Sequence, residues 1–359
     1  AIGKRTDDDR VGLLAAAFYA VMVLPIQLSH FYTPDGLFAA LAALSLYQSV
    51  KAEQQGARRD FILTGIFVGL AASVRLGGIL LLVPLAVVRL GRLLSRAQRN
   101  SSEVWSRRAW RIFILPGVAL GVALALLSLL QPHMVLEPTD YLRPKGGGDL
   151  MTSVGIANGQ IARTWTLYDG AQPRFFFQLT NLLYFAVGLP LQIVGLLGLV
   201  FLLKRPSVAH YQVLAWCVLW FLTIGVLQAK NIRYLAPLLP FLALGAARLC
   251  LLAYRASVNR LRVFTAVGIA LLLLSSAVHA AAFTSIYGAS HSRIDAGLDI
   301  ARRFPTGSTI GVEHTGLSME PHIPPGYRVQ PIMTGALFNL DRYLLAHEKI
   351  ELLFQWLQA

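Results

Sequence analysis

Apolar runs separated by short polar loops follow one another along most of the chain. A helix that crosses the hydrocarbon core of a bilayer needs about 20 mostly apolar residues. By this criterion the sequence predicts nine membrane-spanning helices, over residues 11–30, 36–50, 61–75, 77–90, 112–130, 181–203, 212–228, 234–254 and 263–283. Several of these runs are short. The third and fourth are joined only by Arg75, Leu76 and Gly77, so we expect them to form a tight helical hairpin.

The polar segments divide the chain into a transmembrane module, residues 1–283, and a C-terminal tail, residues 284–359. The module contains one long loop, 131–180. In the tail, residues 292–303 have a helical pattern, and 308–313 and 327–332 have the pattern of strands. The predicted fold class is therefore an all-α polytopic membrane protein with a small extracytoplasmic α/β segment at its C-terminus.

The distribution of Lys and Arg predicts the orientation of the helices, because cytoplasmic loops carry an excess of these residues. One set of alternate loops holds 18 of them and the opposite set holds 7. The richer set comprises the loops around residues 4–10, 51–59, 89–111, 204–205 and 255–262. We expect this set to be cytoplasmic, which places the turn 30–35, the loop 131–180 and the tail on the outer face.

Composition excludes a soluble enzyme. Hydrophobic residues make up 55% of the chain and charged residues 14%, against about 25% charged residues in ordinary soluble domains. The net charge of +14 would otherwise suggest nucleic-acid binding, but the basic residues stand between apolar runs, so no nucleic acid is expected. Cys217 and Cys250 both lie in apolar runs, and no Cys/His spacing typical of a metal site occurs. We therefore expect neither a structural disulfide nor a metal site built from cysteine and histidine, and the sequence leaves a requirement for a divalent metal open.

The segment from His30 to Asp35 carries the clearest candidate chemistry. Outside the tail, Asp35 is one of few carboxylates on the predicted outer face, with Glu137, Asp140, Asp149 and Asp169. A carboxylate beside apolar spans is costly and is often functional, so Asp35 is the candidate catalytic residue, expected to face an outward-opening cavity. The alternative is structural, because Pro34 and Asp35 also suit the first turn of a helix.

Basic residues at outer helix ends could bind an anion. Arg75 follows a glycine-containing helix, and Lys230, Arg233 and Tyr234 begin another. Cations at a helix N-terminus oppose the helix dipole, and a phosphate would compensate them. We expect these four residues to form a phosphate-binding site close to Asp35. The alternative is snorkelling of the basic side chains to the membrane interface, with Tyr234 in the aromatic belt.

Three further residues, His30, Glu137 and Asp140, are weaker candidates that the outer loops could bring to the same site. The segment 133–140 equally fits an amphipathic helix that rests on the membrane. His314, after the first predicted strand, and His279, inside an apolar run, are more simply explained as structural.

Taken together, these segments resemble the C-type (GT-C) membrane glycosyltransferases, in the branch of protein O-mannosyltransferases and the lipid A aminoarabinose transferase. The run from His30 through Thr33-Pro34-Asp35 into Phe38 resembles the second luminal acidic motif of that family. Residues 65–75 are similar to its "GLxxGLAxxxK" helix, with Arg75 in place of Lys. The resemblance continues through 181–198, through 233–240, similar to "RYxxPxxP", and into 304–310. Each motif is degenerate, but their order covers essentially the whole chain.

The resemblance implies transfer of a sugar from a polyprenyl-phosphate donor to a protein or glycan acceptor on the extracytoplasmic face of a cell membrane, bacterial by this likeness. A carboxylate would activate the acceptor and cations would stabilise the leaving phosphate; the resemblance implies no certain cofactor. Family members carry two further helices before the first span, with a catalytic Asp in the loop between them. Asp7, Asp8 and Asp9 cannot replace that residue, because the charge bias places them inside. We therefore expect either an N-terminally incomplete sequence or, as the alternative, a non-catalytic subunit of a larger membrane complex.

Overall fold

The computed structural model describes residues 2–97, 108–142, 150–161, 166, 172–204, 206–313 and 322–332. The chain forms two compact units. The first comprises residues 1–136, 174–226 and 231–283, and the second comprises 137–173, 227–230 and 284–359. Parts of the predicted loops and of the tail lie outside the described residues, namely 98–107, 143–149, 162–165, 167–171, 205, 314–321 and 333–359. Expectations that concern Asp149, Asp169 and His314 therefore have no structural counterpart.

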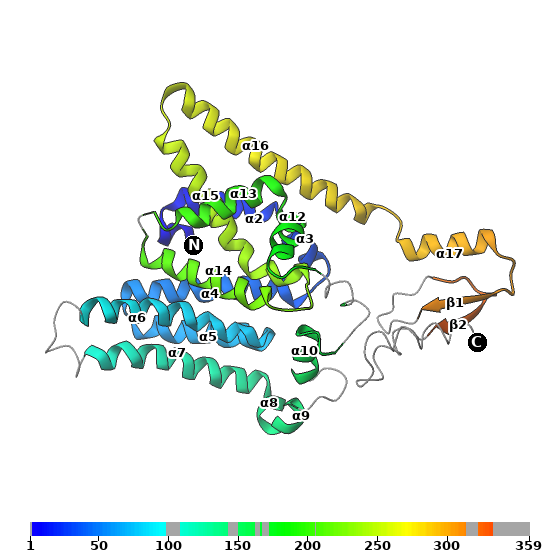
Figure 1. Cartoon of the computed structure of the whole chain (residues 1–359), viewed down its shortest axis with the longest axis horizontal. Helices are drawn as coiled ribbons and strands as arrows, with labels where there is room; N and C mark the ends of the chain where they lie inside the picture. The colour runs from blue at the N-terminus through cyan, green and yellow to red at the C-terminus, as the bar shows by residue number, and fades with distance from the viewer. Residues whose placement is uncertain are drawn as a thin grey trace. The chain divides into compact units, whose positions relative to one another are not determined.

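Helices make up the described part of the first unit (Figure 1). In chain order they are α1 (Ile2–Thr6), α2 (Asp9–Ala20), α3 (Val23–His30), α4 (Pro34–Gln55), α5 (Arg58–Val74), η1 (Leu76–Leu82), α6 (Val83–Ala97), α7 (Arg108–Leu130), α8 (Pro132–Leu136), η3 (Gln178–Leu182), α12 (Leu183–Val187), α13 (Leu189–Phe201), α14 (Val208–Gly225), η4 (Ile232–Leu238), α15 (Leu239–Ala256) and α16 (Asn259–Thr284).

Several of the predicted spans are interrupted, and nine complete spans are not established. Among the described residues, 4 helices are long and apolar enough to cross a membrane, or up to 6 if each bent pair is one span. The run 11–30 breaks between α2 and α3 with a bend of 60°, and the run 181–203 breaks before α13 with a bend of 115°. Gly188, at φ 80°, makes the second break, and Pro190 follows it in the first turn of α13. Glycine tolerates this left-handed backbone at no steric cost.

Glycines bring two pairs of helices into close contact. Gly65 and Gly69 lie one turn apart on α5 and face α7, where a Cβ at Gly65 would come 2.5 Å from the carbonyl oxygen of Ala119. A Cβ at Gly198 of α13 would come 2.1 Å from the carbonyl oxygen of Gly245 on α15. Small residues spaced in this way allow backbones to approach in membrane helix pairs. The glycines at 65, 69 and 198 thus allow close packing of these helices.

Ion pairs join the helix ends that lie opposite Asp35. Glu53, near the end of α4, pairs with both Arg89 and Arg92; it lies about 27 Å from Asp35 along the helix at 1.5 Å per residue. Lys51 pairs with the buried Asp60 at 2.8 Å. These contacts gather residues of the predicted cytoplasmic set at one end of the first unit, as alternating spans require. That this end faces the cytoplasm remains a prediction of the charge bias.

The turn before α2 lies at the same end of the first unit as Glu53, opposite Asp35. Asp7 pairs with Arg248 at 2.8 Å and lies 3.3 Å from His210 Nε2, and Asp8 pairs with Arg255. Burial raises the pKa of Asp7, but the hydrogen bond with His210 and the positive charge of Arg248 outweigh this effect, so the pKa lies below its ordinary value. Asp7 and Asp8 thus have arginine partners at the opposite end from Asp35, in agreement with the expectation that they cannot serve the candidate site.

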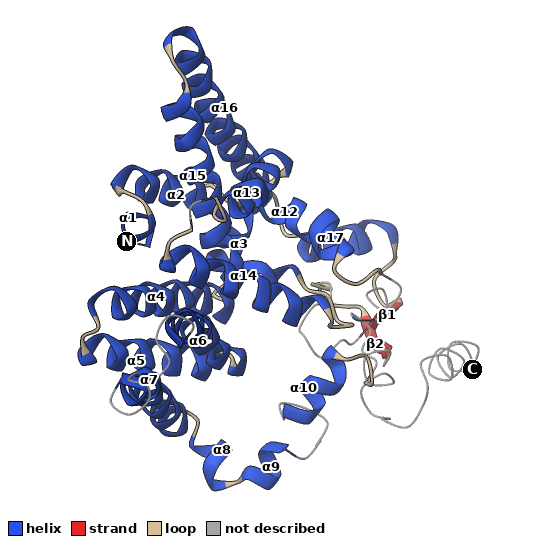
Figure 2. Cartoon of the chain, turned by 60° about the vertical axis from the view of Figure 1, so that its left-hand side comes forward, coloured by secondary structure: helices blue, strands red, loops and turns tan. Residues whose placement is uncertain are grey.

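The second unit contains short helices and a small sheet (Figure 2). Its described elements are α9 (Pro138–Leu142), α10 (Leu150–Ala157), η5 (Ser285–Gly288), α17 (Ser292–Arg303), β1 (Thr309–Glu313) and β2 (Arg328–Ile332). The two strands pair in parallel, with Thr309 opposite Arg328. α17 covers the predicted helical stretch 292–303, and the strands lie within the stretches 308–313 and 327–332; the extracytoplasmic α/β segment as a whole stays a prediction.

Candidate functional site

The backbone before α4 places Asp35 in the first turn of that helix. α3 ends at His30, and the chain turns through Tyr32, which has a positive φ of 54° and is 97% exposed. Thr33 is the N-cap residue, and Pro34 occupies the first turn, where its missing N–H leaves no hydrogen bond unmade. The free N–H groups and the dipole of the helix favour a carboxylate at this position.

Asp35 is buried, with only 1% of the residue exposed. Its Oδ1 forms an ion pair with Arg75 Nη2, and its Oδ2 lies 4.0 Å from Arg233 Nε. Among the described residues, Oδ2 has no hydrogen-bond donor. In this arrangement the carboxylate is covered by the side chain of Arg75, and the expectation that Asp35 faces an outward-opening cavity stays a prediction.

The two arginines and Tyr234 surround this carboxylate from separate segments. Arg75 follows α5, and Arg233 and Tyr234 belong to η4. The guanidinium carbons of Arg75 and Arg233 lie 5.7 and 6.0 Å from the centre of the Tyr234 ring, within the range of cation–π attraction. Their side chains are 28% and 44% exposed. Simple snorkelling does not describe Arg75, because its guanidinium pairs with a buried acid.

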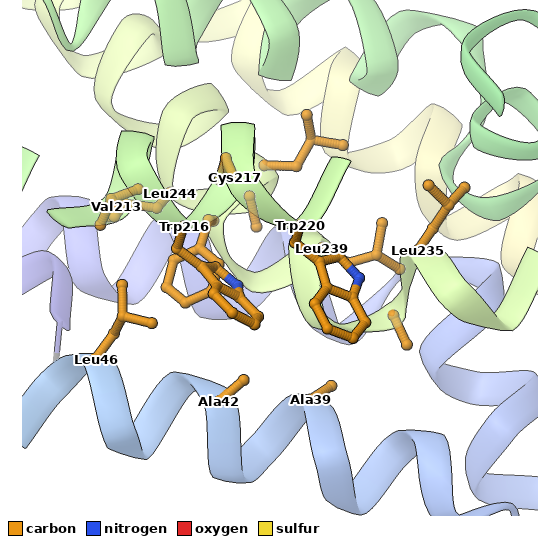
Figure 3. Packing of buried hydrophobic residues seen from close by; sticks show 14 of the residues in the cluster. Ala39, Ala42, Leu46, Val213, Trp216, Cys217, Trp220, Leu235, Leu239 and Leu244 are labelled. Atoms are coloured by element: carbon orange, nitrogen blue, oxygen red, sulfur yellow. The ribbon is translucent and has the colours of Figure 1, made fainter. Parts of the chain in front are cut away.

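Two tryptophans of α14 hold the segment that carries Arg233 and Tyr234. Pro237 and Pro240 lack an N–H, so neither can donate to the carbonyl three residues earlier, as a 3₁₀ turn requires. Those carbonyls belong to Tyr234 and Pro237. Trp220 Nε1 donates to the carbonyl oxygen of Tyr234 at 2.8 Å, and Trp216 Nε1 donates to that of Pro237 at 3.1 Å. The indole rings stack with their centres 5.1 Å apart and lie between α14 and Ala39, Ala42 and Leu46 of α4 (Figure 3).

Trp220 also contacts the other two segments of the site. Its ring lies 5.2 Å from that of Phe38, which follows Asp35 by one helical turn. A Cβ at Gly77, two residues after Arg75, would come 2.9 Å from the indole ring. Trp220 therefore positions the segments of Asp35, Arg75 and Arg233 together. The sequence interpretation did not identify this residue, although the two prolines three residues apart indicate carbonyls that need external donors.

Other predicted site residues are not brought to this cluster by the described contacts. Lys230, Glu137 and Asp140 belong to the second unit; Lys230 Nζ donates to the carbonyl oxygen of Gln228 at 3.1 Å. His30 ends α3, with its ring edge-on to Phe31 at 5.2 Å. The functional roles of these four residues stay predictions. Within the described residues, no three side chains of His, Cys, Asp or Glu gather in a way that could hold a metal ion.

Comparisons with known proteins agree on one kind of fold. A family model described as dolichyl-phosphate-mannose-protein mannosyltransferase matches residues 1–124, which include Asp35 and Arg75. The apo crystal structure of the Archaeoglobus fulgidus oligosaccharyltransferase is similar with a TM-score of 0.50 and 15% identity, covering 86% of this chain and 49% of that one. ArnT from Cupriavidus metallidurans, bound to undecaprenyl phosphate, is similar with a TM-score of 0.50 and 16% identity, covering 92% of this chain and 68% of that one.

These similarities show that the chain has the fold of the C-type membrane glycosyltransferases. No curated protein matches the sequence. The chain spans about half the length of the oligosaccharyltransferase and about two thirds of ArnT. At this level of identity the two solved structures establish the fold alone.

Proposed function

We propose that the chain is a membrane glycosyltransferase that transfers a sugar from a polyprenyl-phosphate donor to a protein or glycan acceptor on the extracytoplasmic face. The observation that carries this proposal is the cluster of Asp35, Arg75 and Arg233 at one end of a fold shared with such enzymes. ArnT, which has this fold, was crystallised with undecaprenyl phosphate. The charge bias supports the outer location, and the apolar helices support a multi-pass membrane protein.

The arginines of the cluster have the charge and the unused donors that a phosphate needs. Arg75 Nε is buried and, among the described residues, has no hydrogen-bond acceptor. Buried donors are nearly always paired in native structures, so the orphan marks a place where an acceptor is missing. Two guanidinium groups face one carboxylate, which leaves one positive charge in excess. A lipid phosphate supplies both the acceptor oxygens and the negative charge.

Each group then has one part in the proposed reaction. Asp35 accepts the proton of the acceptor hydroxyl, whose oxygen forms a bond to the anomeric carbon of the sugar. The bond from that carbon to the phosphate oxygen breaks, and the electron pair leaves with the polyprenyl phosphate. Arg75 and Arg233 stabilise the charge that grows on this leaving group. A single displacement of this kind inverts the anomeric configuration.

Arg75 couples donor binding to the release of the base. Its guanidinium pairs with Asp35, and this pair occupies the carboxylate. An arriving phosphate competes for the same guanidinium and so frees Asp35 to accept a proton.

Binding of undecaprenyl phosphate to the purified chain tests the proposal. Removing one charge from a desolvated pair costs about 2–5 kcal/mol, so Arg233→Ala should weaken binding about 30-fold or more at 1.4 kcal/mol per tenfold. Arg262→Ala is the matched control, because Arg262 stacks on Tyr254 at 5.2 Å much as Arg233 stacks on Tyr234.

Equal affinities of the wild type and Arg233→Ala would contradict the phosphate site. Failure of the wild type to bind the lipid would favour the alternative, a non-catalytic subunit of a membrane complex that has kept the fold.

A further inference from the structure

A groove lies between α6 and α14, toward the arginine-rich end of the first unit. Its volume is about 780 Å³, and its walls are mostly aliphatic. Polar groups line it in only a few places, among them Arg92, Ser95 and Tyr211. Val87, Tyr211 and Val218 are each about half exposed, so the groove opens to the surroundings of the helices. It contains no residue of the candidate glycosyltransferase site.

The length of the groove matches one leaflet of a bilayer. On α14 the lining runs from Val208 to Val218, which is about 15 Å at 1.5 Å per residue. The hydrocarbon core of a membrane is about 30 Å thick, so half of it is about the same length. A fatty acyl chain fits this span, whereas a long polyprenyl chain would extend well beyond it.

Arg92 gives the groove a positive mouth. Arg89 and Arg92 share the single carboxylate of Glu53, and the three groups together therefore carry one excess positive charge. The Arg92 side chain remains 38% exposed while that of Glu53 is fully buried. An anionic headgroup would meet a partly exposed guanidinium next to an aliphatic channel, and basic pockets between membrane helices bind lipid headgroups in this way.

We propose that this groove binds an anionic diacyl phospholipid, with the headgroup phosphate at Arg92 and one acyl chain along α14. Such a lipid would fill the space between α6 and α14 and add a ligand for a guanidinium that Glu53 satisfies only in part. The site is separate from that of the donor lipid, since it lies toward the end of the unit opposite Asp35.

Gly91 offers a substitution that blocks the groove without disturbing the protein around it. A Cβ at Gly91 would meet no atom within 4 Å, although the residue lines the groove. Gly91→Leu should therefore project into the channel, and leucine also favours a helix more than glycine does. Gly121→Leu on α7 is the matched control, because a Cβ there also meets nothing within 4 Å and the residue lies outside the groove lining.

The test measures thermal unfolding of the purified full chain in detergent during titration with dioleoyl phosphatidylglycerol or dioleoyl phosphatidylcholine. We expect the anionic lipid to raise the melting temperature of the wild type and of Gly121→Leu more than the zwitterionic lipid does. Gly91→Leu should lose this difference. Arg92→Gln should need about fivefold more of the anionic lipid for the same rise in melting temperature, because one basic residue contributes about 1 kcal/mol to the attraction of anionic lipid.

Three results would overturn the proposal. The first is equal stabilisation of the wild type by both lipids, which needs no variant. The second is a phosphatidylglycerol response that survives in Gly91→Leu. The third is undecaprenyl phosphate stabilising the wild type more than phosphatidylglycerol and losing this effect in Gly91→Leu, which would assign the groove to the donor lipid.

Discussion

Replacement of Arg75 by alanine tests whether Asp35 depends on a buried ion pair. The Asp35 side chain is only 2% exposed and Arg75 is its direct partner. Breaking a buried pair by removing one partner costs about 3–5 kcal/mol, because an uncompensated charge stays buried. Arg75 is itself 28% exposed, and Arg233 remains 4.0 Å from the carboxylate. We therefore expect the lower end of the range, about 3 kcal/mol, for Arg75→Ala.

A second substitution, Asp35→Asn, removes the buried carboxylate charge that Arg75→Ala leaves without its direct partner. Asp35→Asn keeps the shape of the side chain and should cost about 1.5 kcal/mol on its own, since it gives up a charge-assisted interaction. The double variant should then lose about 2.5 kcal/mol rather than 4.5, a coupling energy of about 2 kcal/mol between residues in contact. SDS unfolding titrations of the wild type, both single variants and the double variant provide the four free energies.

Two results would refute this reasoning. A loss of less than about 1 kcal/mol for Arg75→Ala is what an exposed ion pair gives, and it would restore snorkelling as the explanation of Arg75. Additive losses in the double variant would show that the two side chains do not interact. Arg75→Lys should recover only part of the stability, because an ammonium group cannot reproduce the planar contacts of a guanidinium.

Three further predictions concern the framework of the site and the packing of the helices. Trp220→Phe leaves the Tyr234 carbonyl without its indole donor, so it should cost about 1–3 kcal/mol in SDS unfolding and weaken undecaprenyl phosphate binding; unchanged values for both would refute the positioning role. Gly198→Ala should lower the melting temperature, because overpacking costs about 1–3 kcal/mol of stability. Gly117→Ala should not lower it, because a Cβ at Gly117 meets nothing within 4 Å. Equal melting temperatures of the two variants would contradict the close crossing. Because the pKa of Asp7 is lowered from 3.8 in the folded chain, its contribution to stability is present above that pH and lost as the pH falls through the folded value. Asp7→Asn should therefore have a lower free energy of unfolding than the wild type at pH 7, and this free energy should vary less with pH below pH 4. A wild-type pH profile as flat as that of the variant would count against the pairing.

Much of the site could be predicted from residues that lie near helix ends. Asp35, Arg75, Arg233 and Tyr234 each stand where an apolar run begins or ends on the predicted outer side, and alternating spans place such positions at one end of a bundle. What the sequence could not provide was the state of the carboxylate. Its burial against Arg75 depends on the rotamers of side chains from separate segments, which hydropathy does not determine.

The interruptions of the helices were harder to predict than their positions. The runs 11–30 and 181–203 are mostly apolar, so hydropathy treats each as one span, whereas the backbone bends by 60° and 115° within them. Gly188 followed by Pro190 was the available signal for the second bend. The contacts of Asp7 with His210 and Arg248 join residues more than 200 positions apart in the sequence, and no local pattern predicts such pairs.

The most direct test of the central claim is the affinity of the Asp35→Asn variant for undecaprenyl phosphate. If Asp35 and the lipid phosphate compete for Arg75 and Arg233, removal of the carboxylate charge should strengthen binding, by about tenfold for 1.4 kcal/mol. Arg233→Ala should weaken binding in the same assay, and Arg262→Ala should leave it unchanged. Binding by Asp35→Asn that is equal to or weaker than binding by the wild type would contradict the account, because these arginines would then not be shared between the carboxylate and a lipid phosphate.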